Sequence, residues 1–308
     1  MKRALLPHGF TPATRFGTKR PLAKLARRFP RKRAFITGAG SGLGLALARA
    51  LAREGWALGL FDRNVERLAA VEADLSGQGL SLTAYPGDVT HADELTVAIN
   101  SFAAGNDGLD VIINNAGVLA CGTLMEVPTE NWRWTIEVDL MGTVHGCKAA
   151  IPHLQRNGHG LIINVASAAA FAAVPGTIAH NAAKAAVVAL SETLRGELRS
   201  TGTQVSVAMP ALFQTNLLES KRGPAGLREL AATLMRASDY HAAEAAQDIL
   251  VEAAAGSACI VLPRSMRRWW WMKRWLPEFF LRQVRRRRDE LHPYVDRPVR
   301  FDEQDELP

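Results

Sequence analysis

The sequence has few cysteines and no long apolar run. Among its 308 residues, Cys121, Cys147 and Cys259 are the three cysteines, and they lie far apart. Their spacing matches neither a disulfide framework nor a zinc site. No apolar stretch reaches the roughly 18 residues that a transmembrane helix needs. A protein of the reducing cytosol is therefore expected.

Acidic residues are absent from the first part of the chain, so the formal charge of +7 is unevenly spread. Residues 1–33 hold eleven Lys and Arg and no acid, and residues 264–288 hold ten against Glu278 alone. Between them, residues 34–263 carry 14 basic and 22 acidic side chains. We expect a basic N-terminal arm at 1–32, a folded domain at 33–263 and a basic C-terminal extension at 264–308.

The N-terminal arm lacks the continuous apolar segment of a secretory signal. Its arginines and its lack of acids are also typical of a mitochondrial presequence, but Pro7, Pro12, Pro21 and Pro30 oppose a long amphipathic helix. The sequence assigns the arm no function.

Short apolar runs alternate with helix-length amphipathic segments from residue 33 onward. The runs span residues 33–37, 57–61, 81–85, 110–114, 161–165, 204–209 and 259–262. The helical segments between them span residues 43–54, 65–75, 92–103, 132–155, 182–200 and 242–254. Continuous apolar runs are typical of buried parallel strands, and alternation with helices requires crossover connections. The pattern predicts one doubly wound α/β domain of the Rossmann type, with about seven parallel strands and helices on both faces.

A glycine-rich segment joins the first predicted strand to the first predicted helix. Glycines here allow a sharp turn and a close approach to a pyrophosphate, and the helix N-terminus offers free N–H groups to the phosphates. The placement between a strand and a helix predicts nucleotide binding. The segment consists of Thr37, Gly38, Ala39, Gly40, Ser41, Gly42, Leu43 and Gly44.

Asp62 ends the second predicted strand, 18 residues after Gly44. A carboxylate there accepts hydrogen bonds from the adenosine ribose and repels a 2′-phosphate, which favours NAD. Arg63 follows directly and would instead hold the phosphate of NADP. Asp62 can also cap the helix that follows.

From about Arg33 to Pro263 the sequence resembles the short-chain dehydrogenase/reductase family. The glycine segment matches the family's T-G-x-x-x-G-x-G, and three further motifs follow in the family's order. The resemblance assigns adenine contacts to Asp88 and Val89, coenzyme binding to Asn115, Ala116 and Gly117, and nicotinamide contacts to Pro210 and Thr215. Ala211 stands where the family has glycine. The resemblance also implies a symmetric homo-oligomer.

The same resemblance implies hydride transfer between nicotinamide and a carbonyl or alcohol. The family's catalytic serine aligns with Ser167, and its lysine, which also binds the nicotinamide ribose, aligns with Lys184, 17 residues later. His180 stands where the family has its proton-exchanging tyrosine, and Asp139 stands where it has an asparagine. Two of the four expected catalytic positions therefore depart from the family.

Two interpretations of His180 remain open. An imidazole, with an ordinary pKa near 6.5, is suited to general acid–base catalysis at neutral pH. Asp139 would then assist it, through water to Lys184 or by stabilising the cationic ring. Against this, imidazole is shorter than phenol, and a misplacement of about 1 Å can cost about 100-fold in rate. The alternative is a coenzyme-binding pseudoenzyme that acts as a sensor or scaffold.

The substrate side of the sequence is apolar. Residues 215–240 carry leucines at helical spacing, as expected for a lid or for helix packing, and Phe171 and Val174 follow Ser167. The expected substrate is a small apolar alcohol or carbonyl compound.

Residues 264–288 combine aromatic and basic side chains, and four of the seven tryptophans lie there. This pattern is typical of a helix in a membrane interface with anionic headgroups, here at the inner face of the cell membrane. Packing against the domain, or between subunits, is the main alternative. The charge could also hold nucleic acid non-specifically, but no recognition module accompanies it, so no specific nucleic acid is expected.

Overall fold

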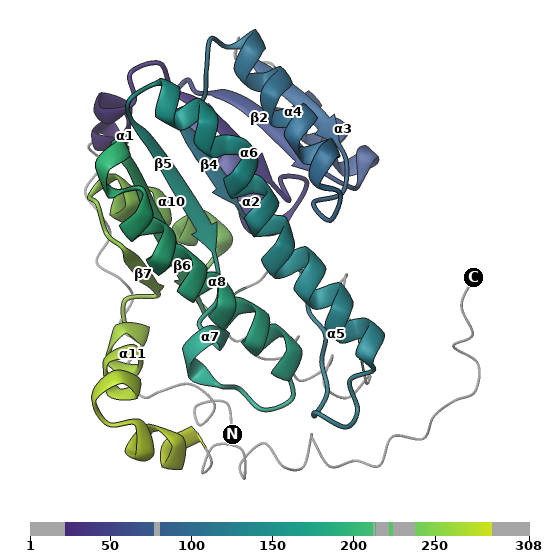
Figure 1. Cartoon of the computed structure of the whole chain (residues 1–308), viewed down its shortest axis with the longest axis vertical. Coiled ribbons are helices and arrows are strands. Elements are labelled where there is room, and N and C mark those ends of the chain that lie inside the picture. Colours follow the sequence, from purple (N-terminus) through teal and green to yellow (C-terminus); the bar gives the residue numbers. More distant parts are fainter. Residues whose placement is uncertain (1–21, 77–80, 212, 214–221, 224–237, 285–308) are drawn as a thin grey trace, which may run out of the picture.

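The computed structural model describes residues 22–76, 81–211, 213, 222–223 and 238–284. Its centre is a sheet of seven strands in the order β3-β2-β1-β4-β5-β6-β7, and every neighbouring pair is parallel (Figure 1). The predicted doubly wound domain is confirmed, and each apolar run forms one strand. The strands are β1 (Arg33–Thr37), β2 (Ala57–Asp62), β3 (Leu82–Pro86), β4 (Val111–Asn114), β5 (Gly160–Val165), β6 (Thr203–Pro210) and β7 (Cys259–Leu262).

Helices cover both faces of the sheet because successive strand residues point to opposite sides. In β1, Ala34 and Ile36 pack on one face and Phe35 packs on the other. The first face is covered by α1 (Ala23–Arg28), α2 (Gly42–Ala52), α3 (Val65–Ser76) and α10 (Ala242–Ala254). The second face is covered by α4 (Ala92–Gly105), α6 (Gly142–Arg156) and α8 (Ile178–Glu197).

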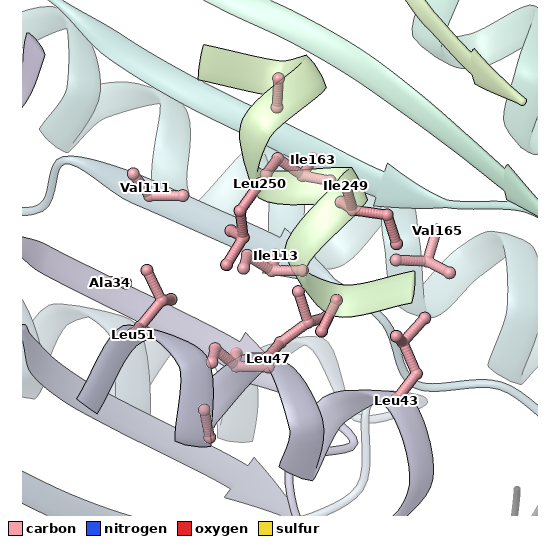
Figure 2. Close-up of a cluster of buried hydrophobic side chains, with 14 of the residues drawn as sticks. Ala34, Leu43, Leu47, Leu51, Val111, Ile113, Ile163, Val165, Ile249 and Leu250 are labelled. Atoms are coloured by element: carbon pink, nitrogen blue, oxygen red, sulfur yellow. The ribbon is translucent and has the colours of Figure 1, made fainter. Parts of the chain in front are cut away.

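The core of the first face is formed where α2 and α10 meet over the strands. Figure 2 shows Leu43, Leu47 and Leu51 of α2 facing Ile249 and Leu250 of α10. The three leucines are spaced four residues apart, and the buried pairs of α10 also recur every four residues, so each helix presents one apolar stripe to the sheet. The stripe on α2 fixes the helix that begins in the glycine segment.

The last residues of the N-terminal arm belong to this core. Leu22, Leu25 and Phe29 are at most 3% exposed and lie in the cluster that contains α2 and α10. Their spacing places them on one face of α1. Helix α1 therefore packs in the core of the domain, although the boundary expected at residue 33 would place it outside the domain.

The strand order reverses at β1, which pairs with β2 on one side and with β4 on the other. In parallel α/β sheets, ligands bind beyond the carboxyl ends of the strands at such a reversal. The site is therefore expected beyond Thr37 and Asn114, the last residues of β1 and β4.

Candidate active site

The glycine segment forms a tight turn between β1 and α2. Gly38 and Gly42 have φ values of +65° and +54°, in the left-handed region that favours glycine. A Cβ at Gly44 would overlap the carbonyl oxygen of Gly38. Ser41 precedes the helix without capping it through its side chain, and Leu43 packs in the core. The first N–H groups of α2 are thus available for an anion.

Asp62 fixes the turn from the end of β2. Its Oδ2 accepts a hydrogen bond from the N–H of Gly40 at 2.8 Å, and its Oδ1 accepts one from the N–H of Asn64 at 2.9 Å. The start of α3 is capped by Asn64, whose Oδ1 accepts the N–H of Arg67 at 2.8 Å. Asp62 therefore holds the glycine turn and does not cap α3, while Arg63 is exposed.

Thr37 and Asn115 connect β1 and β4 across the reversal. The Thr37 hydroxyl accepts the N–H groups of Asn115 and Ala116 at 3.0 and 3.1 Å. The Asn115 side chain donates in return to the carbonyls of Thr37 and Gly38, at 3.0 and 3.2 Å. The two predicted coenzyme motifs therefore form one hydrogen-bonded unit.

A buried polar network of Asn114, Cys147, Asn164 and Ser191 adjoins this unit, because Asn114 directly precedes Asn115. Asn114, at the end of β4, donates to Asn164 of β5 at 2.8 Å, and Asn164 donates to Ser191 of α8 at 3.0 Å. Burial raises the pKa of the neighbouring Cys147 thiol to about 12. This thiol stays protonated, and the network positions the strand ends.

The other predicted coenzyme residues lie at strand ends or outside the described residues. Asp88 follows β3, and its Oδ1 accepts both the N–H and the hydroxyl of Thr90 at 2.9 Å. Val89 is buried beside Gly142. The carbonyl of Pro210, at the end of β6, accepts the N–H of Ala168 at 2.8 Å. Thr215 and most of the expected lid fall outside the described residues.

Asp139 lies in a π-helical turn. The single helix expected over residues 132–155 is divided into α5 (Thr129–Ile136), a π-helical turn (Glu137–Met141) and α6. The hydrogen bonds of a π-turn span one residue more than those of an α-helix, and such turns often mark a functional site. The side chain of Asp139 is completely buried there.

Asp139 contacts both His180 and Lys184. Its Oδ2 lies 2.9 Å from Nδ1 of His180 and 3.8 Å from Nζ of Lys184. Its Oδ1 accepts the N–H of Val118 at 2.7 Å. His180 and Lys184 lie one turn apart on α8 and are 5% and 4% exposed. The two substituted positions are thus in direct contact, and Asp139 reaches Lys184 directly as an ion pair, in place of the expected water chain.

The surroundings of His180 determine which nitrogen is free. Nδ1 also lies 2.9 Å from the carbonyl oxygen of Val118. Because both neighbours of Nδ1 are acceptors, Nδ1 carries a proton. Nε2 makes no hydrogen bond to any of the residues that the structure describes. The ring therefore offers Nε2 for proton exchange.

The charge of Asp139 is compensated inside the protein. Burial alone raises the pKa of a carboxyl group. Here the Lys184 ammonium, His180 and the N–H of Val118 together outweigh burial and hold the pKa of Asp139 below its ordinary value. Asp139 is accordingly a buried carboxylate and can stabilise positive charge on the imidazole.

Ser167 follows β5, at the edge of the sheet where the carboxyl ends of β1 and β4 also lie. Its Oγ accepts the N–H of Ala169 at 3.1 Å, as in a serine turn, and the residue is half-buried. Nζ of Lys184 donates to the carbonyl of Val165 at 3.1 Å. Lys184 thereby connects α8 to the strand end that carries Ser167.

Val118 is the residue that sequence reasoning missed. Its N–H and its carbonyl bind Asp139 and His180, and it directly follows the Asn-Asn-Ala-Gly motif. Only its backbone atoms take part, so the type of its side chain gives no signal. Its position after the motif is the one clue that the sequence contains.

Comparisons with known proteins identify the family of the chain. The family model described as short chain dehydrogenase matches residues 32–225. The chain belongs to the short-chain dehydrogenase/reductase family. It is therefore an NAD(P)-dependent oxidoreductase that acts on CH–OH groups.

Two curated members of the family are similar over most of their length. An uncharacterized oxidoreductase of Staphylococcus aureus (strain USA300) is 34% identical over 184 residues, which cover 60% of this chain and 79% of that protein. A D-threitol dehydrogenase of Mycolicibacterium smegmatis is 33% identical over 190 residues, which cover 62% and 73%.

A solved structure extends the likeness to the whole domain. It is a short-chain dehydrogenase/reductase from Burkholderia phymatum in complex with NAD, with a TM-score of 0.74 and 25% identity. The match covers 87% of this chain and 97% of that one. The open glycine turn, the uncapped start of α2 and the carboxylate of Asp62 fit a dinucleotide here.

Proposed function

We propose that this dehydrogenase uses NAD(H), with His180 as the group that exchanges the substrate proton. The 2.9 Å contact between Asp139 and Nδ1 of His180 carries the proposal, because it places a carboxylate beside the imidazole. The hydrogen bond between Nδ1 and the Val118 carbonyl orients the ring and leaves Nε2 free. Asp62 favours NAD over NADP, since its carboxylate at the glycine turn would repel a 2′-phosphate. The amides of α2, Asn115 and Lys184 would hold the coenzyme.

The proposed step transfers a proton and a hydride from an alcohol. When bound, the oxidised coenzyme supplies the hydride acceptor. The hydroxyl O–H bond breaks as its proton moves to Nε2 of His180, the C–H electron pair leaves as hydride, and the carbon–oxygen bond becomes a carbonyl. Ser167 orients the substrate oxygen. Asp139 stabilises the imidazolium that forms, and the reverse reaction returns the proton from it.

We propose an uncharged, apolar substrate. The segment from Ala166 to Ala179, which follows β5 and leads into α8, contains no charged side chain. Phe171 within it packs in the core, so the residue gives less support for an apolar pocket than the sequence suggested. Because a similar protein is a D-threitol dehydrogenase, threitol is the polar compound against which the apolar alcohols are compared.

The test is a turnover assay with NAD and NADP against secondary alcohols of increasing chain length and against threitol. The wild type is expected to reduce NAD with the apolar alcohols. His180→Ala should lower turnover about 100-fold or more, the size of a general acid–base contribution, with NAD affinity by calorimetry unchanged. Unchanged turnover in His180→Ala would remove His180 from catalysis.

His180→Tyr distinguishes the pseudoenzyme alternative. A protein that binds NAD, turns over none of the alcohols as wild type and gains turnover only as His180→Tyr has lost its activity at this position. A wild type that outperforms His180→Tyr supports an imidazole-based enzyme.

A further inference from the structure

The C-terminal aromatic segment, residues 264–284, is a docked helical unit. Helix α11 (Met266–Trp275) ends before Leu276, and Pro277 begins a second helical stretch that continues to residue 284. Proline is well suited to the first position of a helix, because its missing N–H would be unpaired there. Figure 1 shows the two pieces at one end of the sheet, below β7 and beside α7 (Ala169–Ala172).

One side of the segment packs against the domain. Trp269 and Trp270 lie against the core cluster that contains Phe171 of α7. Phe280 is 1% exposed, and its ring is 5.9 Å from that of Trp269. Glu252 of α10 accepts hydrogen bonds from the segment's first two arginines. The segment is therefore held in a fixed orientation.

The other side presents large apolar side chains to solvent. Trp271, Trp275, Leu276 and Phe279 are 51%, 75%, 58% and 48% exposed. The rings of Trp271 and Trp275 stack with centroids 6.5 Å apart, and together with Arg274 they line an open surface hollow. Packing against the domain thus accounts for half of the aromatic residues and leaves the other half uncovered.

Basic side chains surround the exposed rings. Arg268, Arg274 and Arg282 are exposed, Lys273 is half-buried, and Glu278 is the single acid among residues 264–284. Arg274 also lies over the ring of Trp270, with its guanidinium carbon 4.5 Å from the centroid. In the sequence, four more arginines follow at positions 285–288.

We infer that this surface binds an anionic membrane and lies in the plane of the interface. Trp271, Trp275, Leu276 and Phe279 would enter the boundary between headgroups and acyl chains, where tryptophan is favoured, and the arginines would attract the lipid phosphates. None of the helices in the described part of the chain is long and apolar enough to cross a bilayer. The contact is therefore peripheral.

Charge favours the lipid surface over a second copy of the chain. Two copies joined through this surface would bring their arginines together, whereas anionic headgroups neutralise them. Nucleic acid would also neutralise the arginines, but it would leave the apolar side chains Leu276 and Phe279 without a partner.

The experiment measures sedimentation of the full-length protein with vesicles of phosphatidylcholine alone or mixed equally with phosphatidylglycerol. Ionic strengths of about 0.01 M and about 1 M give weak and strong screening. Binding to the mixed vesicles at the lower ionic strength is expected, with a blue shift of tryptophan fluorescence. Phosphatidylcholine alone should bind far less protein.

Two double variants test the two parts of the surface. Trp271→Ser/Trp275→Ser should lower partitioning about 10-fold or more by removing inserted area. Arg268→Ser/Arg282→Ser should lower it about 25-fold at low ionic strength, or about 5-fold per charge. The control Val65→Ser/Val97→Ser removes side chains that are 61% and 67% exposed on α3 and α4, and should change partitioning less than 2-fold.

Three results would overturn the inference. The first is equal partitioning of the Trp271→Ser/Trp275→Ser variant and the wild type, which would assign any vesicle binding to another part of the chain. The second is a result from sedimentation velocity without vesicles: if the wild type self-associates and the Trp271→Ser/Trp275→Ser variant does not, the surface is a contact between copies. The third is binding to duplex DNA with the same sensitivity to both tryptophans.

Discussion

The coenzyme half of the site, around the glycine turn, keeps the residues that the family has, whereas the catalytic half, around α8, does not. Around the glycine turn, the expected residues are present, and they bind one another through hydrogen bonds between side chains and the backbone, as Thr37 and Asn115 do. Around α8, two of the four catalytic positions are substituted, and the substituted residues, Asp139 and His180, touch at 2.9 Å. The first half keeps the family's residues, and the second replaces two of them with a pair of side chains in contact.

This difference indicates that the two substitutions belong together. An imidazole beside an asparagine would lack a counter-charge, and a carboxylate beside a phenol would oppose formation of phenolate. Together with Lys184, which lies 3.8 Å from Oδ2 of Asp139, they form a compensated buried cluster. The pair can be tested as a unit, and the coenzyme half provides the reference.

The largest expected effect is in the coenzyme half. Gly44→Ala places a Cβ against the carbonyl oxygen of Gly38, so the turn and α2 must move apart. A lost hydrogen bond to a charged group costs about 1.5–3 kcal/mol, so we expect NAD affinity by calorimetry to fall about 100-fold. Gly196→Ala is the control, since a Cβ there meets nothing within 4 Å. Equal NAD affinity in Gly44→Ala and the wild type would show that α2 does not hold the coenzyme.

The second effect shows whether the substitutions at Asp139 and His180 act as a pair or independently of one another. We expect His180→Tyr and Asp139→Asn each to lower alcohol turnover, and the double variant, which restores the family's pair, to lose less than the two single losses multiplied together. A coupling free energy of at least about 1 kcal/mol, or about 5-fold in rate, is typical of side chains in contact. The measurement is a double-mutant cycle on kcat/KM.

The kinetic split of Asp139→Asn provides a readout that a purely structural role would not change. Without the Asp139 carboxylate beside it, the imidazolium of His180 that forms during the step is stabilised less, so kcat for alcohol oxidation should fall while the affinity for NAD by calorimetry stays unchanged. Additive losses in the cycle, or a loss of NAD affinity as large as the loss of kcat, would contradict the pairing.

Local patterns predicted the fold, but tertiary contacts decided the site. The seven strands were predictable because each is a continuous apolar run, whereas α1 was not predicted, because this short helix lies in an arm whose prolines oppose a long one. The π-turn around Asp139 was not, because periodicity does not reveal one extra residue in a helix. The contact between Asp139 and His180 joins residues 41 positions apart and depends on how α8 packs.

A smaller effect concerns the choice of coenzyme. Asp62→Asn keeps a side-chain oxygen for the N–H of Gly40 but removes the negative charge that would repel a 2′-phosphate. We expect the ratio of NAD to NADP affinity to fall about 10-fold, which is about 1.4 kcal/mol. An unchanged ratio would assign coenzyme choice to another group, with the exposed Arg63 as the first candidate.

The smallest effect is on stability in acid, and it tests whether Asp139 is held as a carboxylate. Because its folded-state pKa lies below the ordinary value, Asp139 contributes stability that is present above the unfolded pKa, near 3.9, and is lost as the pH falls through the folded pKa. The free energy of urea unfolding should therefore fall more steeply below about pH 4 in the wild type than in Asp139→Asn. Other carboxyl groups titrate in both proteins and cancel in the difference.

Asp74→Asn is the control. It removes an exposed ion pair with Arg49 and should leave the wild-type slope unchanged, because such pairs contribute about 0–1 kcal/mol. Parallel slopes for the wild type and Asp139→Asn would mean that Asp139 is not held as an anion by Lys184 and His180, and the counter-charge for the imidazolium would be lost with it.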